Sequence, residues 1–526
     1  MKWVIPIFVC ALLTPLSGAV SLAPLFSDGA VLQREKPVPI WGTASAGEKI
    51  TVTFAGQSLA TTADTAGRWR INLAALPASD SPRELVVKGT NTLTIRDVVV
   101  GEVWLASGQS NMEWPLSYVV SKADLAAINF PLIRQFKTAK TPAHSPASSV
   151  EGTWAPARPT TAGQFSAVAY YFALELNRRL NVPVGILNSS WGGTGIDPWI
   201  AAEAYSTTPE LAGAFAKHEK VPRPTADEKA AYETLRITWE KARDAAKATK
   251  QPFTEPAPKA PAGTATNRTI TALNNGMIAP LAPYALRGAI WYQGESNTAH
   301  ASGYALRMSA LISGFRTQFA QPHLPVYWVQ LPNFDHGNRN SDTWHWAELR
   351  EAQTKTLAVP HTGQAITIDV GEPKGLHPKN KKPVGERLAL LALARTYAVE
   401  HVVDSGPVFK SAIREGAAYR ISYEPSSGSE PALSALKASP AGLTGFELAG
   451  ADQVFHPADA RIDGATVIVT SAQVANPVAV RYAYRNAPVA GLFNSAGLPA
   501  APFRTDTWPA PKATKSATPP PPIPES

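Results

Sequence analysis

Hydrophobic and polar residues alternate with a period of two in the first hundred residues. The segments ITVTF (50–54) and WRINL (69–73) show this alternation, and ATVIV (465–469) and AVRYAY (479–484) show it again late in the chain. Strict alternation predicts half-buried antiparallel strands. We therefore expect two β-modules, the first a β-sandwich, at residues 20–100 and 401–508.

The middle of the chain has a different pattern. Short apolar runs alternate there with segments of helical periodicity, such as 166–180 and 384–399, and the runs are found at 184–187, 286–292, 326–331 and 365–370. Strands that alternate with helices are typical of a parallel sheet covered by helices. The fold class predicted for residues 101–400 is therefore α/β.

An insertion interrupts this α/β domain at residues 205–262. It contains a long charged segment that opens with Thr225 and Glu228, the spacing of a capping box, and a proline-rich stretch follows. Tyr232, Leu235 and Trp239 share one face of the predicted helix. The insertion either shapes a substrate groove or decorates the surface.

The first 19 residues have the pattern of a secretory signal peptide. A basic start is followed by an apolar stretch and then by the small residues Ser17 and Ala19. The only cysteine, Cys10, lies inside this segment, so the mature chain is expected to contain none. We expect a secreted or periplasmic protein without a membrane span, and residues 509–526, rich in proline, are expected to form a disordered tail.

The formal net charge of the chain is +8. The basic residues are scattered, apart from a cluster at Lys379, Lys381 and Lys382, and no nucleic-acid-binding motif accompanies them. Nucleic acid is therefore not an expected partner. The histidines match no metal-binding spacing, and we expect neither a metal nor an organic cofactor.

Four strings of small and polar residues stand where predicted strands end. They are GQSN (108–111), NSSWGGTG (188–195), WYQGESN (291–297) and DVGEPKGLHP (369–378). In a parallel sheet the carboxyl ends of the strands meet at one edge, which is where sites form. The sequence therefore predicts that these four loops come together.

Their residue types suit ester hydrolysis through a serine nucleophile. Ser110 supplies a hydroxyl, His377 a base and Asp369 a carboxylate that could orient the imidazole. An oxyanion needs hydrogen-bond donors, which Gly192 and Gly193 could supply through their backbone and Gln293 through its amide. Each residue alone also has an ordinary structural interpretation, such as a helix cap for Ser110 or a turn for the glycines.

The order Ser, Asp, His also occurs in α/β-hydrolases, whose nucleophile turn needs glycine two positions after the serine. Met112 stands there, so that class is disfavoured. Only eight positions separate Asp369 from His377, so one loop could carry both.

These strings resemble the sialate O-acetylesterase family, a branch of the SGNH hydrolases, whose sheet is flavodoxin-like. GEVWLASGQSNMEWPL, GILNSSWGGTGIDPW and WYQGESN occur in the family's order, followed by the LHP stretch, and YAYRNAPVAGLFNSAGLPAAPFRTD resembles the family's C-terminal ending. The resemblance spans nearly the whole chain. It implies a carbohydrate O-acetylesterase that forms an acetyl-serine intermediate and acts on an acetylated sugar or glycan.

Carried over by position, the resemblance makes Ser110 the nucleophile and His377 the base. It implies an oxyanion hole formed by the Ser110 N–H, Gly192 or Gly193, and Gln293. Many SGNH enzymes place the acid three residues before the histidine, where this chain has Lys374, so Asp369 is the first candidate and Glu372 the second.

Aromatic residues near the four strings could form a platform for the sugar. We expect Trp191 and Trp291, together with Glu295, to bind substrate, and Trp114 and Trp199 lie close to the same strings. Core packing is the competing interpretation for each tryptophan.

Three alternatives stay open. The esterase could act on acetylated xylan or xyloglucan rather than on a sialic acid. A glycoside hydrolase could use Glu295 and Asp369 as a carboxylate pair, although Ser110 and His377 would then have no role. The β-modules and the 14 tryptophans would also suit a non-catalytic carbohydrate-binding protein. The sequence gives no indication of the oligomeric state.

Overall fold

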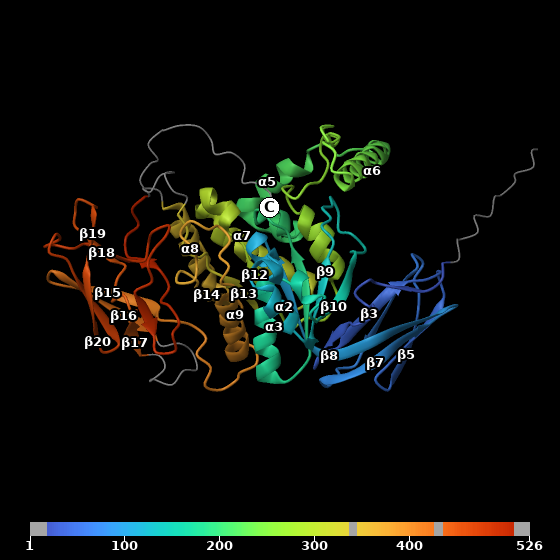
Figure 1. The fold of residues 1–526 in the computed structure, drawn as a ribbon, viewed down its shortest axis with the longest axis horizontal. Coiled ribbons are helices and arrows are strands. Elements are labelled where there is room, and N and C mark those ends of the chain that lie inside the picture. The colour runs from blue at the N-terminus through green and yellow to red at the C-terminus, as the bar shows by residue number, and fades with distance from the viewer. Residues whose placement is uncertain (1–17, 336–343, 425–434, 510–526) are drawn as a thin grey trace, which may run out of the picture.

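The structure is a computed structural model, and it describes residues 18–335, 344–424 and 435–509. A central domain of sheet and helices lies between two β-modules, one near each end of the chain (Figure 1). The predicted signal peptide and tail lie almost entirely outside the described residues and stay predictions. No helix of the described residues is long and apolar enough to cross a membrane.

The central sheet is built mainly of parallel strands. Neighbouring strands follow the order β10 (Gly152–Ala157), β9 (Phe130–Thr138), β11 (Val184–Ser190), β8 (Thr92–Gly108), β12 (Gly288–Tyr292), β13 (Val326–Val329) and β14 (Thr362–Ala365). Only β10 is antiparallel to its neighbour within this series. When β8, β11, β12, β13 and β14 are numbered 1 to 5 along the chain, their order across the sheet is 2-1-3-4-5, which is the flavodoxin-like order. The predicted α/β fold class is confirmed.

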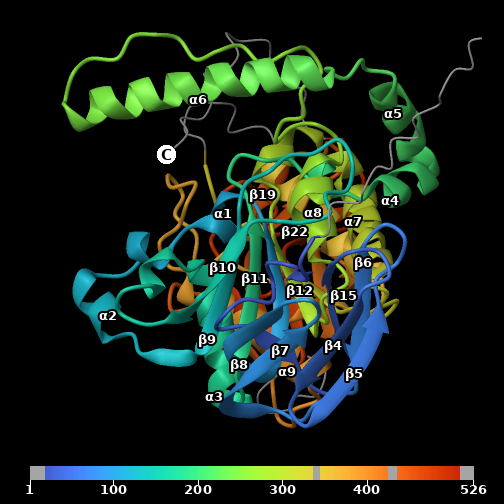
Figure 2. The same cartoon turned by 90° about the vertical axis from the view of Figure 1, so that its right-hand side faces the viewer.

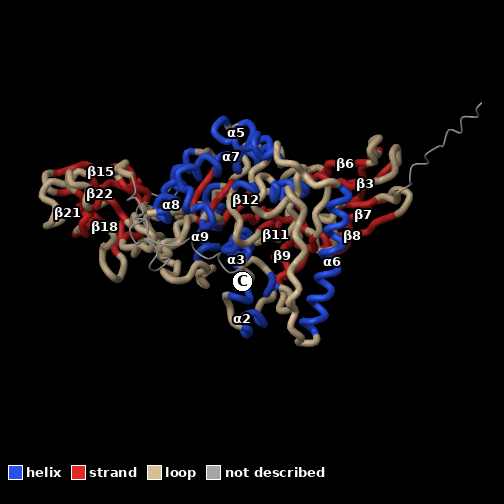
Figure 3. The backbone as a smooth tube through the Cα atoms, turned by 90° about the horizontal axis from the view of Figure 1, so that it is seen from above, coloured by secondary structure: helices blue, strands red, loops and turns tan. Residues whose placement is uncertain are grey.

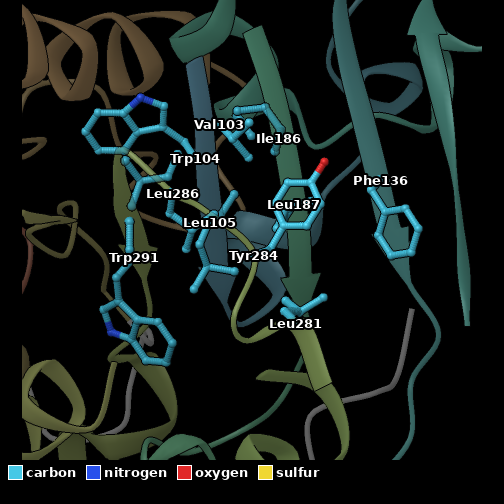
Figure 4. Packing of buried hydrophobic residues seen from close by; sticks show 14 of the residues in the cluster. Val103, Trp104, Leu105, Phe136, Ile186, Leu187, Leu281, Tyr284, Leu286 and Trp291 are labelled. Atoms are coloured by element: carbon cyan, nitrogen blue, oxygen red, sulfur yellow. The ribbon is translucent and has the colours of Figure 1, made fainter. Parts of the chain in front are cut away.

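Helices cover both faces of this sheet. On one face, Trp104 of β8 packs against Phe172 of α3 (Ala167–Leu180) with ring centroids 5.0 Å apart. On the other, Trp291 of β12 lies 6.4 Å from Phe315 of α7 (Tyr304–Gln318). Figure 3 shows β11 and β12 between α7 and α3, and Figure 4 shows both tryptophans in the packed core.

Two further long helices complete the layers. The helix α9 (Lys382–Arg395) packs beside α3, and α8 (His345–Lys355) packs beside α7. The helices predicted at 166–180 and 384–399 therefore exist, with α9 starting two residues early and ending four residues early. A short helix, α2 (Lys122–Ala127), lies before β9.

The N-terminal β-module continues into the central sheet through β8. Residues 92–98 of this 17-residue strand pair with β7 (Ser79–Lys88), and residues 102–108 pair with β11. The predicted boundary between residues 100 and 101 thus falls inside one strand. The remaining strands of the module are β1 (Ser21–Leu22), β2 (Val31–Gln33), β3 (Val38–Thr43), β4 (Lys49–Phe54), β5 (Gln57–Thr62) and β6 (Arg68–Leu73).

The C-terminal β-module has a core of its own, with Ile421, Leu448 and Tyr482 among its buried residues. Its first sheet contains β15 (Val408–Glu415), β16 (Ala418–Glu424), β21 (Thr466–Thr470) and β20 (Asp459–Asp463). The other strands are β17 (Leu436–Ala438) with β23 (Leu492–Asn494), and β19 (Phe455–Pro457), β18 (Phe446–Ala449), β22 (Ala479–Tyr482) and β24 (Phe503–Arg504).

One strand prediction was wrong. The apolar run 365–370 is not a strand, because β14 ends at Ala365 and the chain turns at 368–370. Ile366 and Ile368 are apolar because they pack into the core of the C-terminal module. Buried residues of a loop therefore gave the same run of apolar residues in the sequence as a buried strand.

The insertion is helical. The helix α4 (Ala202–Thr207) leads into it, and it contains α5 (Pro209–Glu219) and α6 (Ala226–Ala248). The predicted capping box at Thr225 and Glu228 is present at the start of α6. No residue of α6 is buried. Figures 1 and 2 both show this helix standing off the body of the molecule on the same side as α5.

Candidate active site

The strand β8 ends in a sharp turn at Gly108, and the short helix α1 (Ser110–Glu113) begins two residues later. Gly108 has φ +139°, and a Cβ built there would lie 2.1 Å from the carbonyl oxygen of Tyr292. Only glycine permits this approach. The turn places Ser110 at the first position of the helix, where its own N–H has no hydrogen-bond partner in the described part of the chain.

Neighbouring strands hold this turn at the carboxyl edge of the sheet. Gly108 is in register with Ser190 of β11 and with Tyr292 of β12. The Gln109 N–H donates to the Tyr292 carbonyl over 3.0 Å, and the Trp191 N–H donates to the Gly108 carbonyl, also over 3.0 Å. Three of the four predicted strings therefore start from one fixed edge.

The fourth string brings His377 to Ser110. The His377 Nε2 lies 2.7 Å from the Ser110 Oγ, although 267 positions separate them in the chain. Burial, with a smaller contribution from the Lys381 ammonium, lowers the pKa of His377 to about 4. The imidazole is therefore neutral at pH 7 and can accept the serine proton. The Trp114 ring lies against it, with centroids 4.6 Å apart and the planes 31° apart.

Neither carboxylate predicted to act as the acid is bonded to His377. Asp369 forms a two-point ion pair with Arg387 of α9, with both distances 2.6 Å. The Glu372 Oε1 accepts the Lys379 N–H over 2.9 Å. Among the described residues, no aspartate or glutamate forms a hydrogen bond or ion pair with His377. Both candidates instead tie down the loop that carries the histidine.

The oxyanion-hole candidates differ in what their N–H groups already contact. The Gly192 N–H donates to the Glu113 Oε2 over 2.7 Å, and the other oxygen of Glu113 pairs with Lys140 at 2.6 Å. The Gly193 N–H has no partner within the described residues. With φ +72° and open space around its Cα, Gly193 is the more accessible glycine of the two.

Gln293 is fully buried, contrary to its predicted role as a donor to the oxyanion. Its Nε2 donates to Asn297 Oδ1 over 2.7 Å, and it also lies 3.1 Å from Gln109 Oε1 and 3.2 Å from the Thr194 carbonyl. Because an amide nitrogen has two hydrogens, these acceptors saturate it. The prediction for Gln293 is corrected to an internal structural contact.

Asn297 was missed by sequence reasoning, although it lies in the same WYQGESN string. Its Oδ1 accepts from Gln293 Nε2 and from the Ile196 N–H over 3.0 Å, so its amide orientation is fixed. The Nδ2 has no partner among the described residues and is not one of the fully enclosed polar atoms. Asn297 therefore presents a free, oriented donor.

The three residues predicted to bind substrate lie in different environments. Trp191 is half-buried, and the Lys140 Nζ lies 5.6 Å from its ring centroid. Trp291 is 0 % exposed and packs between Trp199 and Phe315. The prediction for Trp291 is therefore wrong, because a buried core ring offers no surface to a sugar. Trp199 is buried in the same way.

Glu295 also fails as a surface contact. Burial raises the pKa of its carboxyl group, its Oε1 accepts from Asn111 Nδ2 over 2.5 Å, and its Oε2 is enclosed without a hydrogen-bond partner in the described residues. Asn111 is bonded in turn to Lys381. In the sequence Lys381 was noted only as one member of a basic cluster with Lys379 and Lys382, and it was not assigned to the site.

Within the described residues, no three His, Cys, Asp or Glu side chains are grouped so that they could hold a metal ion. The expectation that no metal or cofactor is needed stays a prediction. What the site does contain is a serine hydroxyl bonded to a neutral imidazole at the carboxyl edge of a flavodoxin-like sheet. That arrangement is the one that a serine hydrolase built on a flavodoxin-like sheet requires.

Comparison with known proteins identifies the family. Residues 261–393 match the family described as carbohydrate esterase, sialic acid-specific acetylesterase. The chain is 30% identical to the sialate O-acetylesterase of Rattus norvegicus over 427 residues, 72% of this chain and 74% of that protein. The corresponding Mus musculus protein is 28% identical over 424 residues, which cover 72% and 74% of the two chains.

A solved structure is similar as well. A carbohydrate acetylesterase from Xanthomonas citri is 39% identical and superposes with a TM-score of 0.78, covering 93% of this chain and 100% of that one. This chain therefore belongs to the carbohydrate esterase family of sialic acid-specific acetylesterases, and it is a carbohydrate acetylesterase. The family resemblance noted in the sequence is confirmed.

Proposed function

We propose that the chain removes O-acetyl groups from sugars by nucleophilic attack of Ser110, with an acetyl-serine intermediate. The observation that carries this proposal is the 2.7 Å contact between Ser110 Oγ and His377 Nε2. His377 takes the hydroxyl proton as the oxygen attacks the acetyl carbonyl, and then returns it to the departing sugar oxygen. Water, activated by the same imidazole, hydrolyses the acetyl-enzyme to acetate.

The negative charge that develops on the carbonyl oxygen needs oriented donors. We propose the N–H groups of Ser110 and Gly193 and the Nδ2 of Asn297, because each lacks a partner among the described residues. Gln293 then acts behind Asn297, since it fixes the orientation of that amide through Oδ1. Gly192 positions the loop through Glu113.

The proposed mechanism uses His377 without a carboxylate partner. Ser110 and the ring of Trp114 fix the imidazole, and the loop around it is tied by Asp369 to Arg387 and by Glu372 to the Lys379 N–H. These contacts orient the ring in place of the acid of a conventional triad.

For the substrate we propose an O-acetylated sialic acid. The mammalian relatives carry that activity in their names. Lys140 supports the proposal, because its side chain is 43% exposed beside Trp191 and Glu113 and its ammonium can pair with the sialic acid carboxylate. An acetylated plant polysaccharide is the second candidate, because the carbohydrate acetylesterase of Xanthomonas citri, whose sugar is not named, is 39% identical to this chain.

The glycoside hydrolase alternative is not supported. It requires Glu295 and Asp369 to face one glycosidic bond, whereas Glu295 is buried against Asn111 and Asp369 is paired with Arg387. Neither carboxylate is placed to contact a sugar.

The experiment that tests the function compares acetate release by the mature chain and by Ser110→Ala from O-acetylated sialic acid, acetylated xylan and acetylated xyloglucan. We expect the wild type to prefer the sialic acid and the variant to lose at least about a thousandfold in rate. Lys140→Met should raise KM for the sialic acid and leave KM for the neutral polysaccharides unchanged. Equal rates for wild type and Ser110→Ala would overturn the mechanism, and a preference for xylan would overturn the substrate.

We also propose that the chain is exported, on the strength of its first 19 residues. N-terminal sequencing of the protein from its native host should give a mature start near Val20. A start at Met1 would contradict export.

A further inference from the structure

A buried charged group stands directly behind the catalytic pair, and the reaction steps above do not use it. The Lys381 Nζ donates to Asn111 Oδ1, and the Asn111 Nδ2 donates to Glu295 Oε1 over 2.5 Å. Lys381 and Asn111 are each 1 % exposed. Burying an ammonium and a carboxylate is costly, so an enclosed lysine at this point calls for a functional explanation.

The group contacts the loop that carries His377. The same Asn111 Nδ2 donates to the carbonyl of Leu376 over 3.1 Å, and Leu376 precedes the histidine. Asn111 itself follows Ser110 in helix α1. One amide therefore connects the chain beside the nucleophile to the chain beside the base.

Lys381 also lies against the ring that faces the imidazole. Its Nζ is 5.7 Å from the centroid of Trp114, the ring that also lies against His377, and 5.4 Å from the centroid of Tyr292. A cation within about 6 Å of a ring centroid is attracted to the ring when it stands over its face. The lysine is thus fixed by one hydrogen bond and two aromatic rings.

The charges that face this lysine come from two segments. Glu295 lies at the start of the turn after β12, and Glu372 lies in the loop before His377. Burial lowers the pKa of Lys381 to about 7, and the two carboxylates oppose this change with smaller effects that raise the pKa. Toward His377 the Lys381 ammonium acts in the opposite sense to a triad acid, because it disfavours the imidazolium and lowers the pKa of the ring.

We propose that Lys381, Asn111 and Glu295 form a positioning unit that holds His377 against Ser110. Lys381 orients the Asn111 amide through Oδ1, and this leaves Nδ2 to bind Glu295 and the Leu376 carbonyl. Without the lysine the Asn111 amide is free to rotate, and the His377 loop loses the hydrogen bond from Asn111 to the Leu376 carbonyl. The inference rests on the proposed function, because it assigns these residues a task in that same reaction.

The first test is the pH profile of kcat/KM for a small acetyl ester. In the wild type the acid limb should follow the protonation of His377. The value of kcat/KM should not change between pH 7 and about pH 5, and it should fall near pH 4. In Lys381→Met, which keeps the apolar stem, the limb should move upward, because one cause of the lowered histidine pKa is removed. It should stay below the ordinary histidine value of about 6.5, because burial, the larger cause, remains. We expect kcat to fall about tenfold to a hundredfold, with KM changed less than threefold.

Lys381→Met leaves the Glu295 carboxylate buried without its cation and could fail to fold. The double variant Lys381→Met with Glu295→Gln removes both charges, while the glutamine oxygen still accepts from Asn111. It should fold, and it should retain the upward shift and the lowered kcat. Lys382→Met is the matched control, since that lysine is exposed and pairs only with Glu386 at 3.8 Å within the described residues.

The outcomes separate the two proposals. A double variant that folds with the wild-type acid limb and the wild-type kcat would overturn the positioning unit. Absence of Ser110-dependent acetate release in the wild type would overturn the proposed function instead. If the acid limb shifts equally in Lys382→Met and in Lys381→Met, the shift comes from the net charge of the protein and not from the positioning unit. That result would also contradict the proposal.

Discussion

The two halves of the Ser110–His377 pair are held in place by different kinds of structure. Ser110 follows a turn whose backbone is bonded to two neighbouring strands, through Gln109 to Tyr292 and through Gly108 to Trp191. His377 lies in the segment 366–381, which contains no strand and connects β14 to α9. Side-chain contacts hold this segment: Asp369 to Arg387, Glu372 to Lys379, and Asn111 to Leu376.

This difference has a consequence for mutation. A backbone ladder tolerates changes of side chain but does not tolerate a change that alters φ or blocks the approach of two chains. A loop held by side chains responds to the loss of each polar contact in turn. Substitutions on the nucleophile side should therefore act on folding, and substitutions on the histidine side should act on activity and stability together.

The largest effect is expected at Gly108. An alanine there places its Cβ 2.1 Å from the Tyr292 carbonyl oxygen at φ +139°, so Gly108→Ala should lose at least about 3 kcal/mol of unfolding free energy. Gly193→Ala is the control, because φ is +72° and no atom lies within 4 Å of the added carbon; it should cost about 1 kcal/mol. Urea unfolding measures both, and equal losses would contradict the assigned role of the turn.

The next effect is expected at Asp369. Asp369→Asn removes the anionic partner of Arg387, whose side chain is 10% exposed, and should lose about 2 kcal/mol of unfolding free energy. Acetate release should fall about tenfold, because the His377 loop loosens. Thermal unfolding and kinetics on the same preparation decide the point. Full stability with a loss of about ten-thousandfold in kcat would instead show that Asp369 is the triad acid.

A smaller effect is expected at Glu372, the second acid candidate. Glu372→Gln keeps an oxygen that can accept the Lys379 N–H, so kcat should stay within about threefold of the wild type. Glu372→Ala removes that acceptor and should lower kcat further. Steady-state rates of the two variants provide the comparison. A loss in the glutamine variant as large as in the alanine variant would mean that the charge, rather than the loop tie, is what matters.

The smallest effect is expected in the insertion. Thr225→Ala removes the hydroxyl that accepts the Glu228 N–H at the start of α6 and should cost that helix about 1 kcal/mol. Because no residue of α6 is buried, kcat on a small acetyl ester should not change. Hydrogen exchange of residues 226–232 checks the helix. A changed KM for a polymeric substrate would show that the insertion shapes the binding groove.

The same contrast explains what could be predicted from the sequence. The turn at Gly108 was predictable, because an apolar run that ends in Gly-Gln-Ser-Asn is typical of a strand followed by a turn. The helix at 167–180 and the capping box of α6 followed from periodicity and cap chemistry. These features depend on residues close together in the chain.

The contacts that hold His377 could not be predicted in this way. In the sequence Lys381 is one member of a basic cluster, and only the fold shows that it turns inward to Asn111, 270 positions away in the chain. Trp291 and Glu295 were misplaced because a strand-end string does not show which of its side chains face inward. Long-range polar contacts leave no periodic pattern in the sequence.

The most direct test of the account is covalent trapping of Ser110. The mature chain is treated with an uncharged p-nitrophenyl phosphonate at pH 7, and its intact mass and peptides are measured. We predict one phosphonyl group per chain, located on the peptide that contains Ser110, and none in Ser110→Ala or His377→Ala. Labelling at another residue, or no labelling of a preparation that releases acetate, would contradict the assignment of Ser110 as the nucleophile.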